Sequence, residues 1–428
     1  MQEKSVKLRD AFGIGREIPQ NYVEREEVDK AFLENLSRDK HIVIYGSSKQ
    51  GKTTLRKHCL EDDDYIVVSC VNTMTLDDLN GAILKSAGFQ IEQTNTKTVG
   101  GHLKYGVEFR GEAKIPLIAK AGADTNIEKI SDKHETRQYR KLEIDLNDVN
   151  DIILSLKSTD FRKFVVLEDF HYLPVETQQN FSFCLKVFHE NSAICFIVIG
   201  VWREKNRLIY YNGDLTNRVS SIDVDTWSKN HLNSVICAGE QLLNVSFDKE
   251  TAVELVDQCS ESVSLLQEAC FRICETEGVY ETQSTLREIG SNSDVRMLMK
   301  DIVNDQAGRY LAFINNFAEG FQQTNYDMYR WIMYVVLRSE HEDLESGIRR
   351  SVFSKIIKEK HPVGSKLNEG NITQALQSAA ALQVTKNIRP IIIDYDQTTR
   401  VMHVVDRSFL IWLALQDRNN LIEEIGII

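Results

Sequence analysis

The segment GSSKQGKT, from Gly46 to Thr53, combines residue types that bind phosphate groups. It matches the pattern G-x-x-x-x-G-K-[ST] at every position, follows the apolar run HIVIYG and precedes a helix-like segment. In such a loop, backbone N–H groups surround the phosphates, the lysine reaches the β- and γ-phosphates, and the hydroxyl binds Mg²⁺. We therefore predict a site for ATP and Mg²⁺, formed by Gly46, Ser47, Ser48, Lys49, Gln50, Gly51, Lys52, Thr53 and Thr54.

Two carboxylates follow another apolar run, in FVVLEDFHYL. At the carboxyl end of a strand, Glu168 would hold Mg²⁺ together with Thr53, and Asp169 would orient the attacking water. Enzymes with this kind of loop usually have Asp before Glu. The inverted order indicates slow hydrolysis of ATP, or none, and capping of the next helix is the alternative role.

Two arginines are further candidates for contact with a γ-phosphate. Arg203 follows the run ICFIVIGVW, and Arg218 precedes the short β-rich run VSSIDVD. Surface ion pairs would explain either arginine equally well.

The elements around these residues alternate between strand and helix. Apolar runs with helical sequence between them predict a parallel sheet covered on both faces, as in an α/β P-loop NTPase domain over residues 1–228. Residues 97–141 interrupt this pattern with five glycines and ten Lys/Arg against six Asp/Glu. We interpret them as an inserted hairpin or loop, which is either a solvated excursion or a surface for an anionic or protein partner.

After Trp227 we expect no further strands until the C-terminal part. Residues 229–290 predict three amphipathic helices that form a helical lid, and residues 291–325 a helical connector. Residues 326–428 predict three helices followed by two strands, which is the order of a winged-helix domain.

Composition limits the possible partners and location. The chain of 428 residues has a formal charge of −12, which disfavours general attraction to DNA or to anionic membranes. Eight cysteines without a CxxC pair indicate reduced thiols and no metal site. The start MQEKSVKLRD has no signal-peptide pattern, and the longest apolar run is too short to span a membrane. We expect a cytoplasmic protein without a membrane partner.

With these motifs the chain resembles AAA+-type P-loop ATPases of the Orc/Cdc6 and STAND branch over nearly its whole length. The entry segment NYVERE is similar to the family's F-V-G-R-E, and the resemblance implies that the backbone at Tyr22 and Val23 lines the adenine pocket. It also implies that Arg203 senses the γ-phosphate of its own subunit and that Arg218 completes the site of a neighbouring subunit. The inverted acidic pair, the insertion and the absence of an arginine in the lid segment CSESVSLLQEAC depart from the family pattern.

The resemblance implies an ATPase, and three functions remain open for it. We expect an ATP-dependent switch or assembly ATPase that forms homo-oligomers, engages a separately encoded effector protein and acts in bacterial antiphage defence. A DNA-binding loader of the Orc/Cdc6 or transposition-regulator type is the second candidate. DNA binding is disfavoured because the expected recognition helix, NEGNITQALQSAAALQ, contains no Lys or Arg. A scaffold that binds ATP without hydrolysing it is the third.

Overall fold

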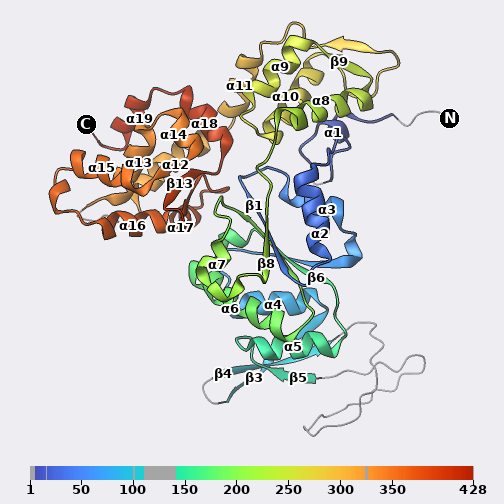
Figure 1. Ribbon diagram of the computed structural model, residues 1–428, viewed down its shortest axis with the longest axis vertical. Coiled ribbons are helices and arrows are strands. Elements are labelled where there is room, and N and C mark those ends of the chain that lie inside the picture. Colours follow the sequence, from blue (N-terminus) through green and yellow to red (C-terminus); the bar gives the residue numbers. More distant parts are fainter. Residues whose placement is uncertain (1–4, 16, 100–101, 110–140, 323–325, 428) are drawn as a thin grey trace.

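The computed structural model describes residues 5–15, 17–99, 102–109, 141–322 and 326–427. A five-stranded parallel sheet in the order β2-β6-β7-β1-β8 forms the centre of residues 17–228, called here the sheet region (Figure 1). Its strands are β1 (His41–Gly46), β2 (Tyr65–Ser69), β6 (Phe164–Glu168), β7 (Phe196–Val201) and β8 (Val219–Asp223). Every residue of β1 and β7 is buried, which confirms the predicted parallel sheet with two covered faces.

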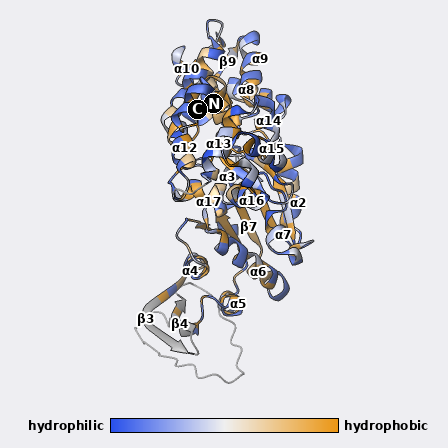
Figure 2. Ribbon diagram, turned by 90° about the vertical axis from the view of Figure 1, so that its left-hand side faces the viewer, coloured by the Kyte–Doolittle hydropathy of each residue, from blue (hydrophilic) through white to orange (hydrophobic). Residues whose placement is uncertain are grey.

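Alternate residues of β1 pack against different layers of helices. Ile42 and Ile44 share a hydrophobic cluster with α2 and α3, whereas Val43 and Tyr45 share one with α4, α5 and α6. Figure 2 shows β7 as predominantly hydrophobic, as a central strand between two helical layers must be. The helices are α2 (Ala31–Leu36), α3 (Lys52–Cys59), α4 (Leu76–Ser86), α5 (Val149–Ser158), α6 (Val175–Asn191) and α7 (Arg207–Tyr211), with short helical turns at η1 (Glu26–Lys30), η2 (Asp62–Asp64), η3 (Phe170–Tyr172) and η4 (Gly213–Leu215).

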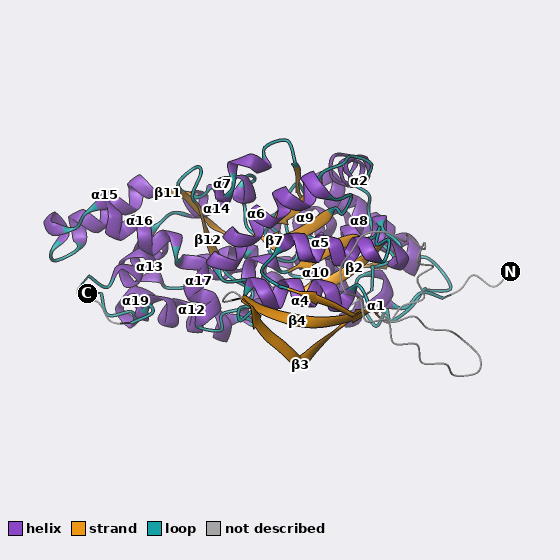
Figure 3. Ribbon diagram, turned by 90° about the horizontal axis from the view of Figure 1, so that it is seen from below, coloured by secondary structure: helices purple, strands orange, loops and turns teal. Residues whose placement is uncertain are grey.

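A separate antiparallel sheet lies between β2 and β6 in the chain. Its order is β3-β4-β5, with β3 (Phe89–Val99), β4 (His102–Phe109) and β5 (Lys141–Ile144), and it packs beside α4 (Figure 3). The predicted hairpin therefore begins at Phe89, because the buried Phe89 and Val107 join its base to the core of the sheet region. Residues 110–140, which make up most of the predicted insertion, lie outside the described residues.

Three helices form the lid region, residues 229–290, as the sequence predicts. They are α8 (Lys229–Leu243), α9 (Lys249–Gln258) and α10 (Val263–Thr276), and a side chain caps the N-terminus of each. The expectation that no strand occurs in this region is wrong: β9 (Val245–Phe247) and β10 (Arg287–Ile289) form a short parallel pair. The N-terminal helix α1 (Leu8–Ala11) packs against α8 and α10.

Residues 326–427, called the C-terminal region, contain the predicted helices and hairpin. Two connecting helices, α11 (Val295–Asn304) and α12 (Ala307–Glu319), precede it. Its elements are α13 (Met328–Arg338), α14 (His341–Ser346), β11 (Ile348–Arg349), α15 (Arg350–Lys360), η5 (Gly364–Lys366), α16 (Glu369–Gln377), α17 (Ala379–Thr385), β12 (Ile393–Asp396), β13 (Val401–Val404), α18 (Arg407–Ala414) and α19 (Arg418–Glu424). The strands form an antiparallel sheet in the order β11-β13-β12. The sequence did not predict α14, β11, α18 and α19, and the single helix predicted for NITQALQSAAALQ is divided at Ser378 into α16 and α17.

The C-terminal region is attached differently to its two neighbours. It shares one continuous hydrophobic core with the lid region, from Leu8 to Ile425. Against the sheet region, a small buried cluster consists of Val201, Val384, Ile391 and Val405. Interfaces of limited apolar area permit relative motion more readily than a shared core does.

Candidate nucleotide site

The predicted phosphate-binding loop connects β1 to α3. Gly46, Lys49 and Gly51 have φ angles of 144°, 60° and 86°. At Gly46 a Cβ atom would approach the Val224 Cγ2 atom to 2.8 Å, so this turn requires glycine. Gly51 precedes α3 without a side-chain cap, and the first residues of α3 line a cavity. The uncapped N–H groups of a helix N-terminus are suited to an anion.

Lys52 lies inside the loop, with 8% of its surface exposed. Its ammonium group donates hydrogen bonds to the carbonyl oxygens of Gly46 (3.1 Å) and Ser47 (2.6 Å). Burial lowers the pKa of Lys52 to about 8, and the charge of Asp225 opposes this shift. A phosphate group beside this lysine would therefore replace weak carbonyl partners with a full negative charge.

The structure brings Glu168 and Thr53 together, as the sequence predicts. The Thr53 hydroxyl donates to Glu168 Oε2 at 3.2 Å, and Arg56 Nε donates to Glu168 Oε1 at 3.1 Å. Burial raises the pKa of Glu168, and the Arg56 guanidinium opposes that rise. Thr53 and Glu168 are thus the pair that could hold a divalent cation, although Arg56 already occupies one carboxylate oxygen.

Asp169 lies on the cavity side of the same strand end. It has a left-handed backbone conformation (φ 58°) and lines the cavity that the loop also lines. Burial raises its pKa, whereas the charges of Lys52 and Arg389 lower it. A carboxylate in this position can accept a proton from a water molecule in the cavity.

The cavity has a volume of about 310 Å³ and lies between the loop, the entry segment and the lid region. Tyr22 and Val23, the predicted adenine-pocket residues, both line it. Trp227 also lines the cavity, and its ring stacks on the Arg25 guanidinium at 4.0 Å. Arg25 also donates to the Val224 carbonyl at 2.8 Å, which fixes the entry segment to the end of β8.

The C-terminal region reaches this site, which the residue patterns do not reveal. The backbone N–H of Ser48 donates to the carbonyl of Val405 at 2.8 Å, and Pro390 lines the cavity. Arg389 stacks on the Tyr172 ring at 4.9 Å and donates to Asn72 Oδ1 at 2.7 Å. One contact with the C-terminal region is therefore made by the phosphate-binding loop itself.

Asp225 is a residue of the site that the sequence analysis missed. It accepts hydrogen bonds from the backbone N–H (2.7 Å) and the hydroxyl (2.8 Å) of Ser47. The predicted sensor Arg203 follows β7 at the same edge of the sheet, with Nε 3.7 Å from Asp225 Oδ2. Asp225 follows β8 much as Glu168 and Asp169 lie at the end of β6. The pattern of an acidic residue at a strand end could therefore have predicted that Asp225 belongs to the site.

Arg218 lies at the other end of β8, away from the loop. Its carbonyl accepts from the N–H of His41 at the start of β1, and its guanidinium pairs with Glu190 at 2.7 Å. It also donates to the carbonyl of Asp214. Arg218 therefore does not contribute to the site of its own chain.

The strand order and the loop together decide the fold. An apolar central strand leads through a G-x-x-x-x-G-K-[ST] loop into a helix, with an acidic residue at the tip of the strand next but one in the sheet. The chain has the fold of a P-loop NTPase. The described residues contain no group of three or more His, Cys, Asp or Glu side chains that could hold a metal ion.

Comparisons with known proteins find similar solved structures at low sequence identity. No family model and no curated protein matches the chain. Among solved structures, the chain is similar to the Walker-type ATPase of Pyrococcus abyssi, at 12% identity and a TM-score of 0.49, covering 95% of this chain and 100% of that one. It is also similar to the Cdc6 protein of Pyrobaculum aerophilum, at 12% identity and a TM-score of 0.41, covering 97% of this chain and 98% of that one. A third similar structure is the Orc1 protein of Aeropyrum pernix in complex with DNA, at 10% identity and a TM-score of 0.44, covering 99% of this chain and 97% of that one.

The assignment of the fold itself follows from the strand order and the loop geometry. In the described part of the chain, no helix is long and apolar enough to cross a membrane.

Proposed function

We propose that this protein is an ATP-dependent switch whose nucleotide state controls the docking of the C-terminal region, and through it self-association and partner binding. The hydrogen bond between the Ser48 N–H and the Val405 carbonyl carries this proposal. A change in the loop on nucleotide binding acts directly on that contact. The interface is also small and partly polar, so a modest free-energy difference between nucleotide states is enough to shift it.

The residues around the cavity have distinct roles in this proposal. Lys52 and the first N–H groups of α3 bind the phosphates of ATP, and Thr53 and Glu168 hold Mg²⁺, which would supply charge neutralisation on the phosphates. Asp169 orients the attacking water. Hydrolysis is slow because Glu168 is shared with Arg56. The third candidate, a scaffold without hydrolysis, has the same binding residues but no turnover.

The C-terminal region is proposed to be a winged-helix domain that packs inward. The order of its elements supports that assignment: the short strand β11 follows α13 and α14, and the helices α15, α16 and α17 lead to the hairpin of β12 and β13. Two of its cations, Arg350 and Lys358, are bound by Glu369, whose pKa the Lys358 ammonium and the other donors lower to about 2. Arg389 contacts the sheet region. These engagements favour the switch over a DNA-binding loader.

Assembly and partners belong to the same proposal. Arg218, partly exposed at the end of β8 away from the loop, completes the site of a neighbouring subunit, so that ATP is bound between copies of the chain. In this proposal the ATPase domain comprises residues 1–228. The helical lid comprises residues 229–290, the connector residues 291–325 and the winged-helix domain residues 326–428. An effector encoded separately, in a bacterial antiphage system within the cytoplasm, is the partner we propose.

Hydrogen exchange and mass measurement with ADP, or with a slowly hydrolysed ATP analogue and Mg²⁺, test the switch. We expect the analogue to raise exchange at the interface between the sheet and C-terminal regions and to increase the mass of the particle. Lys52→Ala is the control, because it should respond to neither nucleotide. Identical exchange and mass in both nucleotide states would rule out the switch, and salt-dependent binding to duplex DNA would favour the loader.

A further inference from the structure

A tight turn in the lid region connects α9 to α10, at a point where three regions of the chain meet. It comprises residues 259–262 and is called here the lid turn. The backbone N–H of Ser262 donates to the carbonyl of Cys259 at 2.9 Å. Between these two residues, Ser260 and Glu261 have φ angles of 49° and 56°.

The backbone of the lid turn is strained. Two successive positive φ angles are typical of a type I′ turn, in which Gly, Asn and Asp predominate. Ser260 and Glu261 each have a Cβ atom that disfavours the left-handed conformation. Such residues keep an unfavourable backbone conformation only where the surrounding structure holds it in place. The neighbours of the lid turn must therefore account for its shape.

The phosphate-binding loop holds the lid turn from one side. Gln50 is fully buried, and its side-chain Nε2 donates to the carbonyl of Glu261 at 3.1 Å. The backbone carbonyl of Gln50 accepts from the indole Nε1 of Trp227, just before α8, at 3.4 Å. Both the side chain and the backbone of one loop residue are therefore bonded to the lid and the residue that leads into it.

The C-terminal region holds the lid turn from the other side. Arg407, the first residue of α18, is only 5% exposed. Its Nη1 donates to the carbonyl of Ser260 at 3.0 Å and lies 3.2 Å from a carboxylate oxygen of Glu261. Two residues earlier, the carbonyl of Val405 accepts from the N–H of Ser48. One short segment of the C-terminal region therefore contacts both the lid turn and the phosphate-binding loop.

The lid turn leads directly to the wall of the nucleotide cavity. Val263 and Ser264, the first two residues of α10, line this cavity together with Gln50 and Gly51 of the loop. Because the lid turn immediately precedes Val263, its conformation sets the position of these lid residues relative to the loop.

We propose that Gln50 and Arg407 are positioning residues that hold the strained lid turn and thereby slow the release of nucleotide from the cavity. When either donor is lost, the turn relaxes toward negative φ angles and Val263 and Ser264 move away from the loop. Both side chains act through the lid turn. The inference rests on the nucleotide binding of the proposed function and not on the docking switch.

Release of ADP with a fluorescent label on the ribose, measured by stopped flow from the full-length protein with Mg²⁺, tests the proposal. Gln50→Met keeps the length of the side chain and removes the donor, and Gln50 Oε1 has no hydrogen-bond partner among the described residues that would be lost. We expect this variant to release ADP about 2- to 12-fold faster, as for the loss of one hydrogen bond. Arg407→Met should have at least as large an effect, because hydrogen bonds from a charged group are stronger. The double variant should fall short of the product of the two effects, since both act on one turn.

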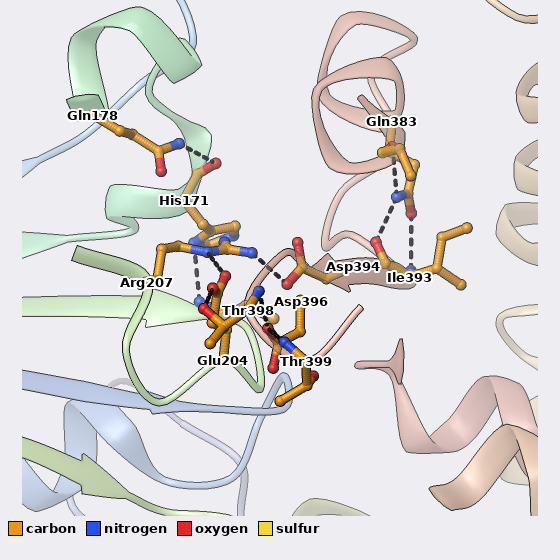
Figure 4. Close-up of polar contacts among 12 residues, drawn as sticks. His171, Gln178, Glu204, Arg207, Gln383, Ile393, Asp394, Asp396, Thr398 and Thr399 are labelled. Atoms are coloured by element: carbon orange, nitrogen blue, oxygen red, sulfur yellow. Dashed lines mark hydrogen bonds and ion pairs between the residues drawn. The ribbon is translucent and has the colours of Figure 1, made fainter. Parts of the chain in front are cut away.

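A separate polar network keeps the C-terminal region docked in these variants. Figure 4 shows Arg207 and Glu204 of the sheet region beside Asp394 and Thr398 of the C-terminal region. Arg207 pairs with Asp394 at 2.5 Å, and the Thr398 hydroxyl donates to Glu204 at 2.7 Å. Both contacts remain in the two methionine variants, so faster release reports the lid turn rather than undocking.

A glycine in the lid turn separates this role from a general loss of stability. Glycine adopts positive φ angles without a Cβ penalty, so the turn should stay formed without its arginine partner. Ser260→Gly added to Arg407→Met should therefore return ADP release to near the parent rate. Asp160→Gly is the matched control, because Asp160 also has a positive φ angle (50°) but is exposed in the sheet region. It should not correct Arg407→Met.

The outcomes distinguish this proposal from the switch. Parent-like ADP release in both methionine variants would overturn the positioning role, even if hydrogen exchange at the interface depends on nucleotide. Faster release in Arg407→Met that Ser260→Gly does not correct would also overturn it. Faster release that Ser260→Gly corrects, in a protein whose interface exchange ignores nucleotide, would support the positioning role and contradict the switch.

Discussion

Replacing Asp394 by asparagine should loosen the contact between the sheet region and the C-terminal region. In the native chain Arg207 Nη2 donates to Asp394 Oδ2 at 2.5 Å, and both side chains are at least nine-tenths buried. Burial opposes the charge of Arg207, but Asp394, Tyr211 and Glu204 together raise its pKa. Asp394→Asn keeps the shape of the side chain and removes the negative charge.

The size of this effect follows from the remaining partners. Breaking a buried ion pair costs about 3–5 kcal/mol when the other charge is left alone. Glu204 remains 3.3 Å from Arg207 Nε, and the new amide can still accept a hydrogen bond. We therefore expect a smaller loss, about 2 kcal/mol, which corresponds to a roughly 30-fold increase in the undocked population.

Hydrogen exchange at the amide of Ser48 measures this population directly. That N–H is bonded to Val405 across the interface, so it exchanges when the regions separate. Asp301→Asn, at an exposed position of α11, is the matched control and should leave the rate unchanged. An unchanged Ser48 rate in Asp394→Asn would refute the reasoning that this ion pair holds the interface together.

Three further predictions concern the nucleotide site. Lys52 keeps its proton to higher pH in the unfolded chain than in the folded chain, where its pKa is about 8. The free energy of unfolding of the parent, relative to that of Lys52→Met, should therefore rise by about 3 kcal/mol between pH 8 and pH 10.5 in denaturant titrations. If this difference in free energy does not change with pH, the lowered pKa is contradicted. In ATPase and binding assays, Asp169→Asn should bind Mg-ATP without hydrolysis, whereas Glu168→Gln should weaken metal-dependent binding; exchanged phenotypes would reverse the two roles. Arg218→Ala and Lys52→Ala should each lack ATPase activity, and a mixture of the two variants should regain part of it. If the mixture stays inactive, a site shared between subunits is contradicted.

Local patterns predicted the centre of the fold well. The runs HIVIYG, FVVLE and FIVIGV form β1, β6 and β7, because short apolar runs rich in β-branched residues are typical of strands buried on both faces. The glycine loop and the strand-end carboxylates could also be predicted from the sequence, because each of these features is formed by a few consecutive residues.

Other features have no local signal. The strands β9 and β10 are three residues each, which is too short for a periodicity to be recognised. The contacts of Val405 with Ser48 and of Asp394 with Arg207 join residues far apart in the sequence, and Val405, Asp394 and Arg207 do not stand in a motif. Such contacts depend on how the regions pack, which one sequence read locally does not contain.

The nucleotide cavity has consequences for the order in which the chain is made. Gly13 and Pro390 both line it, so its walls leave the ribosome several hundred residues apart. At about 5–20 residues per second, that interval is of the order of tens of seconds. During this time the phosphate-binding loop and the sheet are already synthesised, while the residues that close the cavity are not. The cavity is thus complete only after Pro390 has been synthesised, and a shorter growing chain presents a more open loop.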